Sequence, residues 1–422
     1  MYPFSGPQPG QERDGPQGPM KIALTTDTYW PRINGVTVSI DSLRRCLRTL
    51  GHTVYVIAPA YPPAEGSGSV PDDEHVFRLP AFSFPLSPED RVGYPSARLH
   101  VPRLLEDLKP DVVHSQTEFT IGFGGKAYCL RHDVPHFMTC HTWYEHYITT
   151  YFPLLPASFA RAVASSWSRA DYRLIDGLVV PSRWMQGLVR SYGVDCPIEV
   201  IPTGIDPDDF SLAPDVMGEA AARFHVKVPD ISGRRILLYT GRIAKEKNID
   251  FLLGVMQRIR ESAPDALLVL AGRGPQEARL QESVRAQGLE AHVRFAGYLD
   301  RRELTYVLSR AEAFVFASKT ETQGLVLVEA MMCRVPVVAV RARGTEEFLV
   351  DDKGGYLVEE DVEQFAAKVR LLLSDRDTQR QKREEARTAA QEWTAQSMTS
   401  RLLALYDGAL RARQDQDSAR SA

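Results

Sequence analysis

Two glutamates, Glu321 and Glu329, lie in the stretch SKTETQGLVLVEA, which directly follows the apolar run AFVFA. If that run is a parallel strand, Glu321 stands at its carboxyl end, where open α/β sheets bind ligands. Gly324 lets the backbone approach a ligand, and the helix expected after it offers free N–H groups and a positive dipole end to a diphosphate. The first carboxylate can accept hydrogen bonds from sugar hydroxyls, and the second can reach a ribose diol. Taken alone, the two residues also fit an exposed loop acid and an ordinary helix glutamate.

A basic turn follows another apolar run, RILLYT. Gly241 stands at the turn, and Arg242, Lys245 and Lys247 come directly after it. Fixed cations at the carboxyl end of a strand can neutralise a leaving diphosphate without a metal ion. Taken alone, the turn is equally typical of a solvated basic loop.

The elements that must position these side chains are short apolar runs alternating with helical patterns. Such runs are typical of parallel strands covered by helices on both faces, and their spacing implies βαβ units. We therefore predict an α/β fold with two facing Rossmann-like domains. The predicted strands are KIALTT, TVYVIAP, HVFRLP, DVVHSQ, PHFMTC, GLVVPS and IEVIP in the first half, and RILLYTG, ALLVLAG, HVRFAG, AFVFAS, VPVVAV and GGYLV in the second.

The chain has 422 residues, more than the roughly 250–300 at which single cores stop growing. Met20 opens the first predicted strand and is a candidate translation start. The predicted organisation is a disordered tail at 1–19, an N-terminal domain at 20–208, a linker at 209–232, a C-terminal domain at 233–388, a helix at 389–410 that packs back on the N-terminal domain, and a disordered tail at 411–422.

Composition excludes several classes of protein. The net charge of -4 gives no reason to expect a nucleic-acid partner. No apolar run reaches the ~18 residues of a membrane span, and no secretory signal is recognised. The five cysteines are scattered and odd in number, which argues against a disulfide framework and indicates a reducing cytoplasm.

Together the motifs resemble the donor site of retaining glycosyltransferases with the GT-B fold, of the family 4 type. That family carries a Gly-Arg…Glu-Lys turn, matched by residues 241–247, and two glutamates separated by seven residues, matched by Glu321 and Glu329. The resemblance extends over residues 20–410, with Asn34-Gly35-Val36 after the first strand and Ile201-Pro-Thr-Gly-Ile-Asp206 before the linker. It implies a nucleoside diphosphate sugar as donor, and neither a cofactor nor a metal ion.

The resemblance also implies roles for single residues. Thr203 stands where the family commonly has asparagine, so no role is assigned to it. The implied roles are Glu321 at the donor sugar beside the backbone of Gln323, Gly324 and Leu325, Glu329 at the ribose, Arg242 and Lys247 at the diphosphate, the Gly35 loop closing over the phosphates, and the backbone of Tyr298 and Leu299 at the base.

The N-terminal domain is expected to bind the acceptor. Its main motif is TCHTWYEHY, residues 139–147, which contains His141 and Tyr144. His141 is similar to a family histidine close to the transferred sugar, although a histidine that caps a strand turn would look the same. With the stretch around Asp27, this string looks like bacterial diacylglycerol glucosyltransferases and related lipid mannosyltransferases. We therefore place His141 with Glu321 as catalytic, and Asp27 and Tyr144 on the acceptor side.

The predicted reaction moves a hexose, glucose from UDP-glucose, with retention onto a hydroxyl of a membrane lipid such as diacylglycerol. The enzyme would be cytoplasmic and peripheral at the inner face of the membrane. Residues 152–176 fit either an interfacial amphipathic surface or an ordinary buried helix. The alternatives left open are a GDP-mannose-dependent mannosyltransferase, a sugar-nucleotide epimerase, a phosphorylase and a non-catalytic sugar-binding protein. The sequence does not predict the oligomeric state.

Three other motifs are weaker. Gly122-Phe-Gly-Gly-Lys-Ala127 comes too late after its strand for a dinucleotide fingerprint, so it is interpreted as a glycine-rich helix start. His141, Glu145 and His146 match neither helical zinc signature. Asp206-Pro-Asp208 is formally the Asp-x-Asp of another glycosyltransferase fold, but here it is expected to cap a turn.

Overall fold

The computed structural model describes residues 18–32, 34–62, 73–84, 87–152 and 154–421. The predicted disordered tail at 1–19 therefore lies outside the described residues except for its last two positions. Contacts divide the chain into two compact units. The first joins the residues up to Arg32 with Leu47–Phe137 and the residues from Leu402, and the second joins Ile33–Cys46 with Met138–Arg401. All predicted site residues except Asp27 belong to the second unit.

All seven strands predicted in the first half are present, and they form one sheet in the order β3-β2-β1-β6-β7-β8-β9. The described strand pairs of this sheet are parallel, and its inner strands are almost wholly buried, as their uniformly apolar runs predict. The strands are β1 (Lys21–Thr25), β2 (Thr53–Pro59), β3 (Val76–Leu79), β6 (Val112–Ser115), β7 (His136–Thr139), β8 (Gly177–Val180) and β9 (Ile198–Val200).

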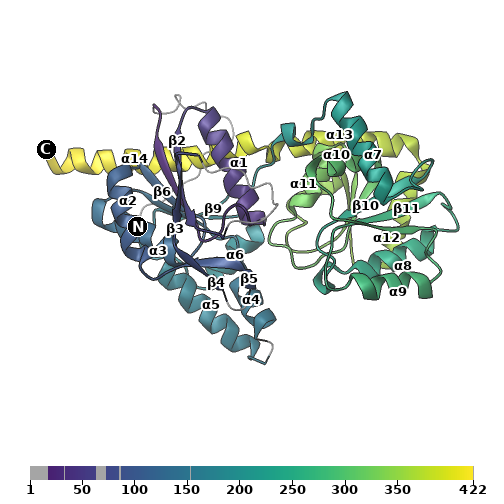
Figure 1. Cartoon of the computed structure of the whole chain (residues 1–422), viewed down its shortest axis with the longest axis horizontal. Coiled ribbons are helices and arrows are strands. Elements are labelled where there is room, and N and C mark those ends of the chain that lie inside the picture. The colour runs from purple at the N-terminus through teal and green to yellow at the C-terminus, as the bar shows by residue number, and fades with distance from the viewer. Residues whose placement is uncertain (1–17, 33, 63–72, 85–86, 153, 422) are drawn as a thin grey trace. The chain divides into compact units, whose positions relative to one another are not determined.

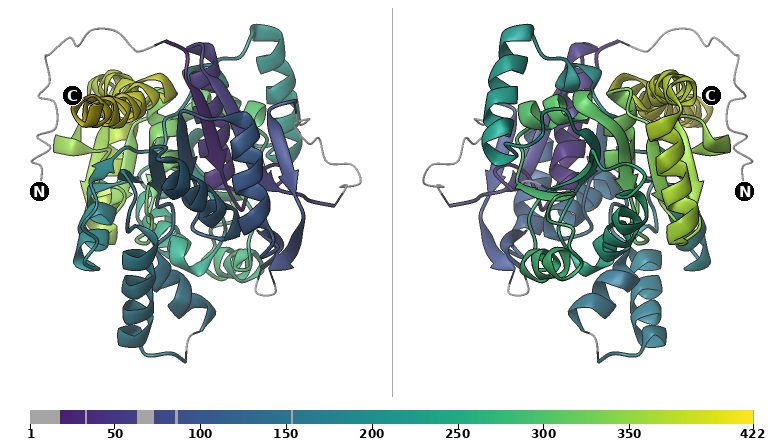
Figure 2. Two further views of the ribbon diagram at one scale, coloured as in Figure 1. Left: turned by 90° about the vertical axis from the view of Figure 1, so that its left-hand side faces the viewer. Right: turned by 90° about the vertical axis from the view of Figure 1, so that its right-hand side faces the viewer.

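The helices of the first half connect these strands (Figure 1). They are α1 (Gly35–Thr49), α2 (Ala97–Leu108), α3 (Thr120–His132), α4 (Tyr144–Tyr151), α5 (Ala157–Asp171) and α6 (Arg183–Ser191). An antiparallel hairpin of β4 (Ala81–Phe84) and β5 (Ser87–Gly93) was not predicted. Its sequence, with a proline and several charges in β5, lacks the apolar run that marks the other strands. In both views of Figure 2, α4 and α5 lie side by side.

The glycine-rich stretch 122–127 begins a helix, as interpreted from the sequence. Gly122, Gly124 and Gly125 lie in the first turns of α3. A Cβ atom added to Gly122 would lie 2.2 Å from the carbonyl oxygen of Thr117, and one added to Gly124 would lie 2.6 Å from Val101 of α2. These glycines therefore serve close packing of the helix, which explains the motif without a phosphate ligand.

The carboxylate of Asp27 fixes the start of α3. Its side chain is buried, and its oxygens accept hydrogen bonds from the hydroxyls of Thr117 at 3.0 Å and Thr120 at 3.1 Å. The backbone N–H groups of Gly93 and Ile121 donate to the same carboxylate, both at 3.4 Å. Burial raises the pKa of Asp27, and these donors oppose the rise. Both oxygens of this carboxylate have hydrogen-bond partners within the fold. These contacts do not test the acceptor-side role, which stays a prediction.

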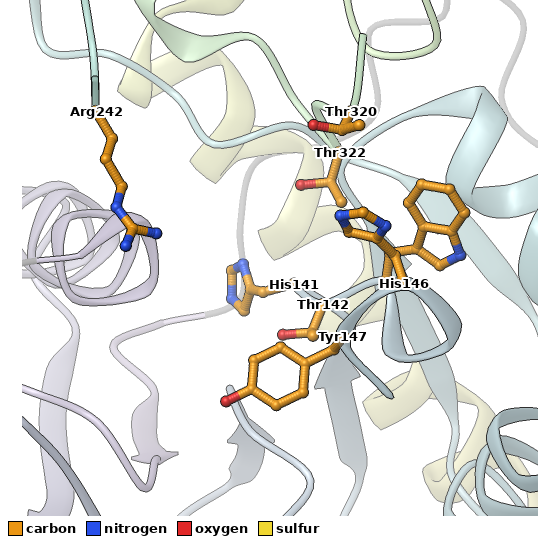
Figure 3. Close-up of a pocket in the computed structure, with 8 residues that line it drawn as sticks. His141, Thr142, His146, Tyr147, Arg242, Thr320 and Thr322 are labelled. Carbon is orange, nitrogen blue, oxygen red and sulfur yellow. The ribbon is translucent and has the colours of Figure 1, made fainter. Parts of the chain in front are cut away.

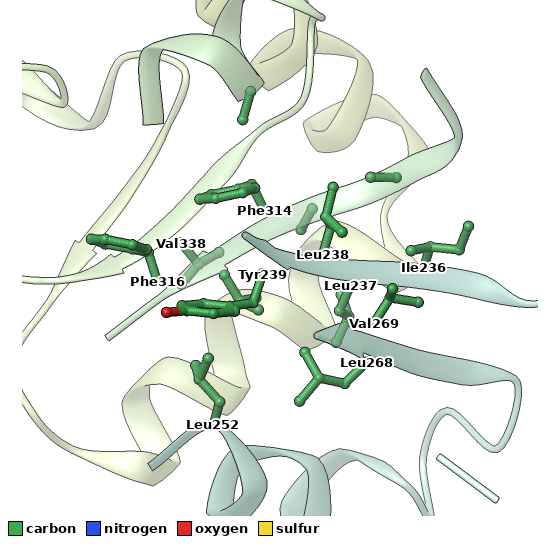
Figure 4. Close-up of a cluster of buried hydrophobic side chains, with 14 of the residues drawn as sticks. Ile236, Leu237, Leu238, Tyr239, Leu252, Leu268, Val269, Phe314, Phe316 and Val338 are labelled. Carbon is green, nitrogen blue, oxygen red and sulfur yellow. The ribbon is translucent and has the colours of Figure 1, made fainter. Parts of the chain in front are cut away.

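The second sheet contains the six strands predicted in the second half, in the order β12-β11-β10-β13-β14-β15. All its pairs are parallel. The aromatic rings of Tyr239, Phe314 and Phe316 stack within its core (Figure 4). The strands are β10 (Arg235–Thr240), β11 (Ala266–Ala271), β12 (Val293–Gly297), β13 (Ala311–Phe316), β14 (Val337–Val340) and β15 (Gly355–Val358).

Helices cover both faces of this sheet, so the predicted fold class is confirmed. Figure 1 shows α8, α9 and α12 on one face and α7, α10, α11 and α13 on the other. The helices are α7 (Pro214–Lys227), α8 (Ile249–Ile259), α9 (Glu277–Ala286), α10 (Arg301–Arg310), α11 (Leu325–Met332), α12 (Val362–Ser374) and α13 (Arg376–Ala390), with short 3₁₀ helices η1 (Pro207–Phe210), η2 (Lys245–Lys247), η3 (Val350–Asp352) and η4 (Gln391–Trp393).

The stretch predicted as a linker differs from the prediction, whereas the Asp-Pro-Asp motif before it agrees. The predicted linker 209–232 contains α7, and its Phe224 is fully buried in the core of the second sheet. Asp206 caps η1 by accepting a hydrogen bond from the N–H of Asp208 at 3.1 Å, as expected for the Asp-Pro-Asp motif.

The final helix, α14 (Ala395–Ser421), continues through the tail predicted to be disordered at 411–422. Alanine, arginine and glutamine in this tail are good helix formers, and extending an existing helix avoids the cost of nucleation. Within the first unit, the buried hydroxyl of Tyr406 on α14 lies 2.6 Å from Nδ1 of His114 on β6. Among the described residues, no helix is long and apolar enough to cross a membrane.

Replacing Asp27 should destabilise the protein. Asp27→Ala leaves buried donors without an acceptor, so we expect the free energy of unfolding to fall by about 3 kcal/mol. Asp107→Ala, at an exposed position on α2, should change it by less than about 0.5 kcal/mol. Urea unfolding of both variants measures the difference. A fully stable Asp27→Ala variant that fails in sugar transfer would instead assign the carboxylate to the acceptor.

Candidate active site

The central feature of the site is an ion pair between Lys247 and Glu321. Lys247 ends η2, shortly after β10, and Glu321 follows β13, the strand that pairs with β10. The carboxyl ends of neighbouring parallel strands meet at one sheet edge, which is why residues so far apart in sequence come together. The ammonium group of Lys247 donates to Oε1 of Glu321, and both side chains are only about one-fifth exposed. The structure thus joins a residue predicted at the diphosphate to one predicted at the sugar.

The turn after β10 is held in a conformation that requires glycine. Gly241 has φ +148, where a side chain is rarely tolerated. The hydroxyl of Tyr239 donates to the carbonyl oxygen of Arg242 at 3.0 Å, which fixes the far side of the turn. Arg242 is exposed and lines a cavity, so its cation is available to a ligand.

The loop that carries Glu321 packs against a second loop, at Gly344. The N–H of Gly324 donates to the carbonyl oxygen of Gly344 at 3.3 Å. A Cβ atom added to Gly344 would lie 2.6 Å from the carbonyl oxygen of Glu321, so a larger residue would displace this loop. Gly324 caps α11, and Leu325 is the first residue of that helix. The predicted positions 321–325 therefore form the approach to a helix N-terminus.

Glu329 lies within α11 and pairs with Arg301, the first residue of α10. Nη1 of Arg301 is 3.1 Å from Oε1 of Glu329. Burial raises the pKa of Glu329, and the nearby guanidinium of Arg301 opposes this rise. The guanidinium also lies 4.7 Å from the ring centre of Phe210 on η1, a cation–π distance. The sequence analysis did not predict Arg301 as a site residue. Its position three residues after Tyr298, whose backbone was predicted to contact the base, could have indicated it.

Gln323 contributes its side chain as well as its backbone. Its Oε1 accepts a hydrogen bond from the N–H of Thr203 at 3.1 Å, and its Nε2 donates to the carbonyl oxygen of Thr203 at 3.3 Å. The hydroxyl of Thr203 lies 3.1 Å from that of Ser39 on α1. Thr203, to which the sequence assigned no role, therefore connects the Glu321 loop to the helix that begins at Gly35.

The start of α1 is built around Asn34 and Gly35. Oδ1 of Asn34 accepts a hydrogen bond from the N–H of Thr37 at 2.9 Å, which caps the helix. A Cβ atom added to Gly35 would meet no atom within 4 Å, so the fold itself does not require glycine there. On the next turns, Arg45 binds both carboxylate oxygens of Asp209 at 3.1 Å.

A cavity of about 360 Å³ brings the histidine motif and the basic turn together (Figure 3). Figure 3 shows the side chains of His141, Thr322 and Arg242 directed toward the same space. Burial lowers the pKa of His141 to about 4, so its imidazole is neutral at physiological pH. The lining residues are His141, Thr142, Trp143, His146, Tyr147, Arg242, Thr320 and Thr322.

The chemistry of this lining is that of a hydroxyl-binding pocket, with hydroxyl and imidazole groups beside one guanidinium. Tyr147 lines the cavity, whereas Tyr144, predicted on the acceptor side, packs against the hydrophobic core of its domain. Leu299 likewise packs against the core of the second sheet. Thr320 and Thr322 flank Glu321 in the sequence, and this position could have predicted that they line the cavity. No group of three or more His, Cys, Asp or Glu side chains suited to a metal ion occurs within the described residues.

Comparison with known proteins identifies the family. Residues 33–209 match the domain described as Glycosyltransferase Family 4, and residues 222–393 match Glycosyl transferases group 1. A GDP-mannose-dependent alpha-mannosyltransferase of Mycobacterium tuberculosis is 30% identical over 341 residues, covering 80% of this chain and 84% of that protein. The chain belongs to the GT-B glycosyltransferases. The predicted family resemblance is therefore confirmed.

Another relative of this glycosyltransferase is named for the synthesis of a glycolipid. An alpha-monoglucosyldiacylglycerol synthase of Streptococcus pneumoniae is 29% identical over 323 residues, covering 76% of this chain and 71% of that protein. Among solved structures, a glycosyltransferase of Rickettsia africae has a TM-score of 0.73 at 17% identity, covering 93% of this chain and 99% of that one. HepE of Anabaena, in complex with UDP, has a TM-score of 0.68 at 16% identity, covering 91% and 98%. These structures share the GT-B fold.

Removing the guanidinium beside Glu329 should change how nucleotide binding depends on pH. In Arg301→Ala, burial acts on the carboxyl unopposed, so its pKa rises further and it becomes neutral at a higher pH. If the carboxylate binds the ribose, the affinity for UDP or GDP should fall as pH is lowered toward the ordinary glutamate pKa, and the fall should begin at a higher pH in the variant than in wild type.

Calorimetric titration of the nucleotide measures this effect. The ratio of variant to wild-type Kd cancels the titration of the nucleotide's own phosphate. Arg302→Ala, at the exposed neighbouring position, is the matched control and should keep a ratio that does not change with pH. A constant ratio for Arg301→Ala would contradict the coupling to Glu329.

Proposed function

We propose that this glycosyltransferase transfers a hexose, with retention at the anomeric carbon, from a nucleoside diphosphate sugar to a hydroxyl of a membrane lipid. The observation that carries the proposal is the convergence of Lys247, Glu321 and the Arg242 turn at one sheet edge, beside the start of α11. Cations, a carboxylate and a helix N-terminus together suit a diphosphate joined to a sugar. The family membership supports the same assignment.

The proposed donor is UDP-glucose and the proposed acceptor is diacylglycerol. Support comes from the alpha-monoglucosyldiacylglycerol synthase of Streptococcus pneumoniae and a second enzyme of this name from Acholeplasma laidlawii, 27% identical over 344 residues. The second candidate is a GDP-mannose-dependent alpha-mannosyltransferase, favoured by the 30% identity to the mycobacterial enzyme. The two candidates differ in the base and in the hydroxyls of the sugar, so a direct comparison of donors separates them.

In the proposed reaction, the bond between the anomeric carbon and the leaving phosphate oxygen breaks as the acceptor oxygen attacks from the same face. The acceptor's proton passes to the leaving phosphate, so no protein nucleophile is needed. Arg242 and Lys247 would stabilise the negative charge that develops on the diphosphate. Glu321 would orient the sugar hydroxyls, and Glu329 would hold the ribose. His141, neutral because it is buried, would exchange hydrogen bonds with the sugar without adding charge.

The same arrangement would allow the enzyme to work without a metal ion. Two cations can replace the divalent ion that many nucleotide-dependent enzymes use at the diphosphate. Leu299 and the backbone beside it would contact the base, and the Gly35 loop would cover the phosphates. Asp27 and Tyr144 are proposed on the acceptor side. We place the enzyme in the cytoplasm, peripheral to the inner face of the cell membrane, because its proposed acceptor is a lipid and its donor is a cytoplasmic metabolite.

The rival functions require different chemistry. An epimerase on this fold would consume the donor without an acceptor. A phosphorylase would need pyridoxal phosphate bound to a lysine. A non-catalytic binding protein would bind the donor without turnover.

Transfer assays with UDP-glucose and GDP-mannose, diacylglycerol and excess EDTA test the proposal. We expect glycolipid formation to continue in the chelator, with the α configuration in the product by NMR. Lys247→Met should lower kcat/KM by about 100-fold or more, because a cation at the leaving group is lost. Lys245→Met, at the exposed end of the same turn, is the control and should stay within about threefold.

For each part of the proposal, this assay has a separate outcome that would contradict it. Loss of activity in EDTA that magnesium or manganese restores would overturn the role of the two cations. A β-linked product would overturn retention. Donor consumption without a glycolipid would favour the epimerase.

A further inference from the structure

Arg343 contacts two tryptophan rings at once. It belongs to the loop after β14, which we define as the Arg343 loop, residues 341–348. Its guanidinium carbon is 5.1 Å from the ring centre of Trp143 and 5.1 Å from that of Trp184. The centres of the two indole rings are 4.9 Å apart, and the rings meet edge to face at 75°. One planar cation therefore lies at cation–π distance from both rings, a role for which arginine is better suited than lysine.

The rings take the place of an acidic partner for Arg343. Arg341, two residues earlier in the same loop, pairs with Glu346 at 3.5 Å and with Glu359 at 3.1 Å. Arg343 has no such ion pair in the part of the chain that the structure describes, and its contacts are those with the two indoles. Its removal should therefore change how the rings are held, without leaving a carboxylate unpaired.

The Arg343 loop is itself held in place. The hydroxyl of the buried Thr345 accepts a hydrogen bond from the N–H of Ala342 at 3.1 Å and donates to the carbonyl oxygen of Ala342 at 2.8 Å. Farther along, the carboxylate of Glu347 accepts a hydrogen bond from the N–H of Arg183, the first residue of α6. A negative charge is favourable at a helix N-terminus. Since Trp184 is the next residue of α6, the loop contacts the start of this helix at two points.

Trp143 connects this arrangement to the cavity of the candidate site. It lines the cavity together with His146, whereas neither Arg343 nor Trp184 does (Figure 3). The indole of Trp143 stacks on the imidazole of His146, with 4.9 Å between the ring centres and 23° between the ring planes. Arg343 therefore reaches this wall of the cavity through Trp143.

The residue after Arg343 contacts the donor side of the site. The carbonyl oxygen of Gly344 accepts the hydrogen bond from the N–H of Gly324, in the loop that carries Glu321. The two loops follow β13 and β14, which pair in parallel, so they meet at the same sheet edge. Adjacent residues of the Arg343 loop thus contact the wall formed by Trp143 and the loop that carries Glu321.

We propose that Arg343 is a positioning residue, which holds Trp143, and with it this wall of the cavity, in a fixed place relative to the Glu321 loop. An acceptor oxygen reacts when it lies within about 3–3.5 Å of the carbon that it attacks, so a wall that shifts lowers the share of productive encounters. The inference rests on the proposed function where it assigns the wall of Trp143 and His146 to the acceptor. The contact of Arg343 with the rings is independent of donor and acceptor.

Steady-state kinetics of Arg343→Ala test the proposal, with diacylglycerol and whichever of UDP-glucose and GDP-mannose supports transfer. We expect kcat/KM for the acceptor to fall by about tenfold, because two cation–π contacts that orient Trp143 are lost. The Kd of the free nucleoside diphosphate, measured by calorimetry, should stay within about twofold of wild type, because the change does not remove the backbone contact of Gly344 with the Glu321 loop. The matched control, Arg341→Ala, removes an exposed arginine from the same loop and should keep both quantities within about twofold.

A second substitution shows whether Arg343 acts through the ring. In a Trp143→Leu background, adding Arg343→Ala should lower the acceptor's kcat/KM by less than about twofold, because the two residues act as one unit. Losses that multiply in the double variant would mean that Arg343 acts independently of Trp143, and would overturn the proposal. A tenfold loss of nucleotide affinity in Arg343→Ala would also overturn it, by placing the guanidinium at the donor.

Near-ultraviolet circular dichroism without any ligand separates this inference from the proposed function. This signal reports fixed packing of aromatic side chains. Arg343→Ala should change it in the otherwise wild-type protein and much less in the Trp143→Leu background, and Arg341→Ala should leave it unchanged. If the signal changes but the wild-type protein transfers no sugar, the proposed function alone is refuted. If Arg343→Ala leaves the signal unchanged, or changes it while the acceptor's kcat/KM stays at the wild-type value, Arg343 is not a positioning residue.

Discussion

The ion pair between Lys247 and Glu321 is the interaction on which the rest of the site depends. Both groups are largely withdrawn from solvent, so each would be costly to leave without its partner. The pair fixes the turn after β10 against the loop after β13, and these two loops supply Arg242, Thr320 and Thr322 to the cavity. A carboxylate held in this way is oriented before a ligand arrives, which lowers the cost of ordering it on binding.

A second set of contacts ties this loop to the start of α1. The side-chain amide of Gln323 forms two hydrogen bonds with the backbone of Thr203, and the hydroxyl of Thr203 forms a hydrogen bond with the hydroxyl of Ser39. In parallel, Arg301 links Glu329 to Phe210. The segment from Thr203 to Phe210 thus contacts Gln323 of the Glu321 loop and Arg301, the partner of Glu329. Movement of this segment would therefore be transmitted to the two positions that we assign to the sugar and the ribose.

The sequence predicted the strands of both sheets because uniformly apolar runs have few other folded states. Its prediction of Glu321, Glu329, Arg242 and Lys247 as site residues came from the family resemblance, because their positions after β10 and β13 also fit ordinary loop and helix residues. It did not predict the pairing of Lys247 with Glu321, since spacing along the chain does not report contacts between distant loops. Arg301 was missed for the same reason. The Gln323 side chain was missed because its partner is a backbone group, which has no signature in the sequence.

Local patterns were misleading where tertiary context decided the outcome. The residues of α7 looked like a linker because their stretch contains prolines and no clear strand, yet Phe224 is buried in the core. The polar residues after 410 looked disordered, yet they extend an existing helix. In α5, an apolar period of four is compatible with either a buried or an exposed face, and only the packing of its alanines decides between them.

The central claim is that Glu321 binds the donor sugar and Glu329 the ribose, and the kinetics of Glu321→Gln and Glu329→Gln test it most directly. Contacts to the sugar strengthen as charge develops at the anomeric carbon, whereas contacts to the ribose are equal in the ground and transition states. Glu321→Gln should therefore mainly lower kcat. Glu329→Gln should mainly raise the donor's KM and weaken product inhibition by the free nucleoside diphosphate. If Glu321→Gln binds the bare nucleotide poorly while Glu329→Gln binds it normally, the two roles are reversed, and if both variants turn over like wild type, the donor site lies elsewhere.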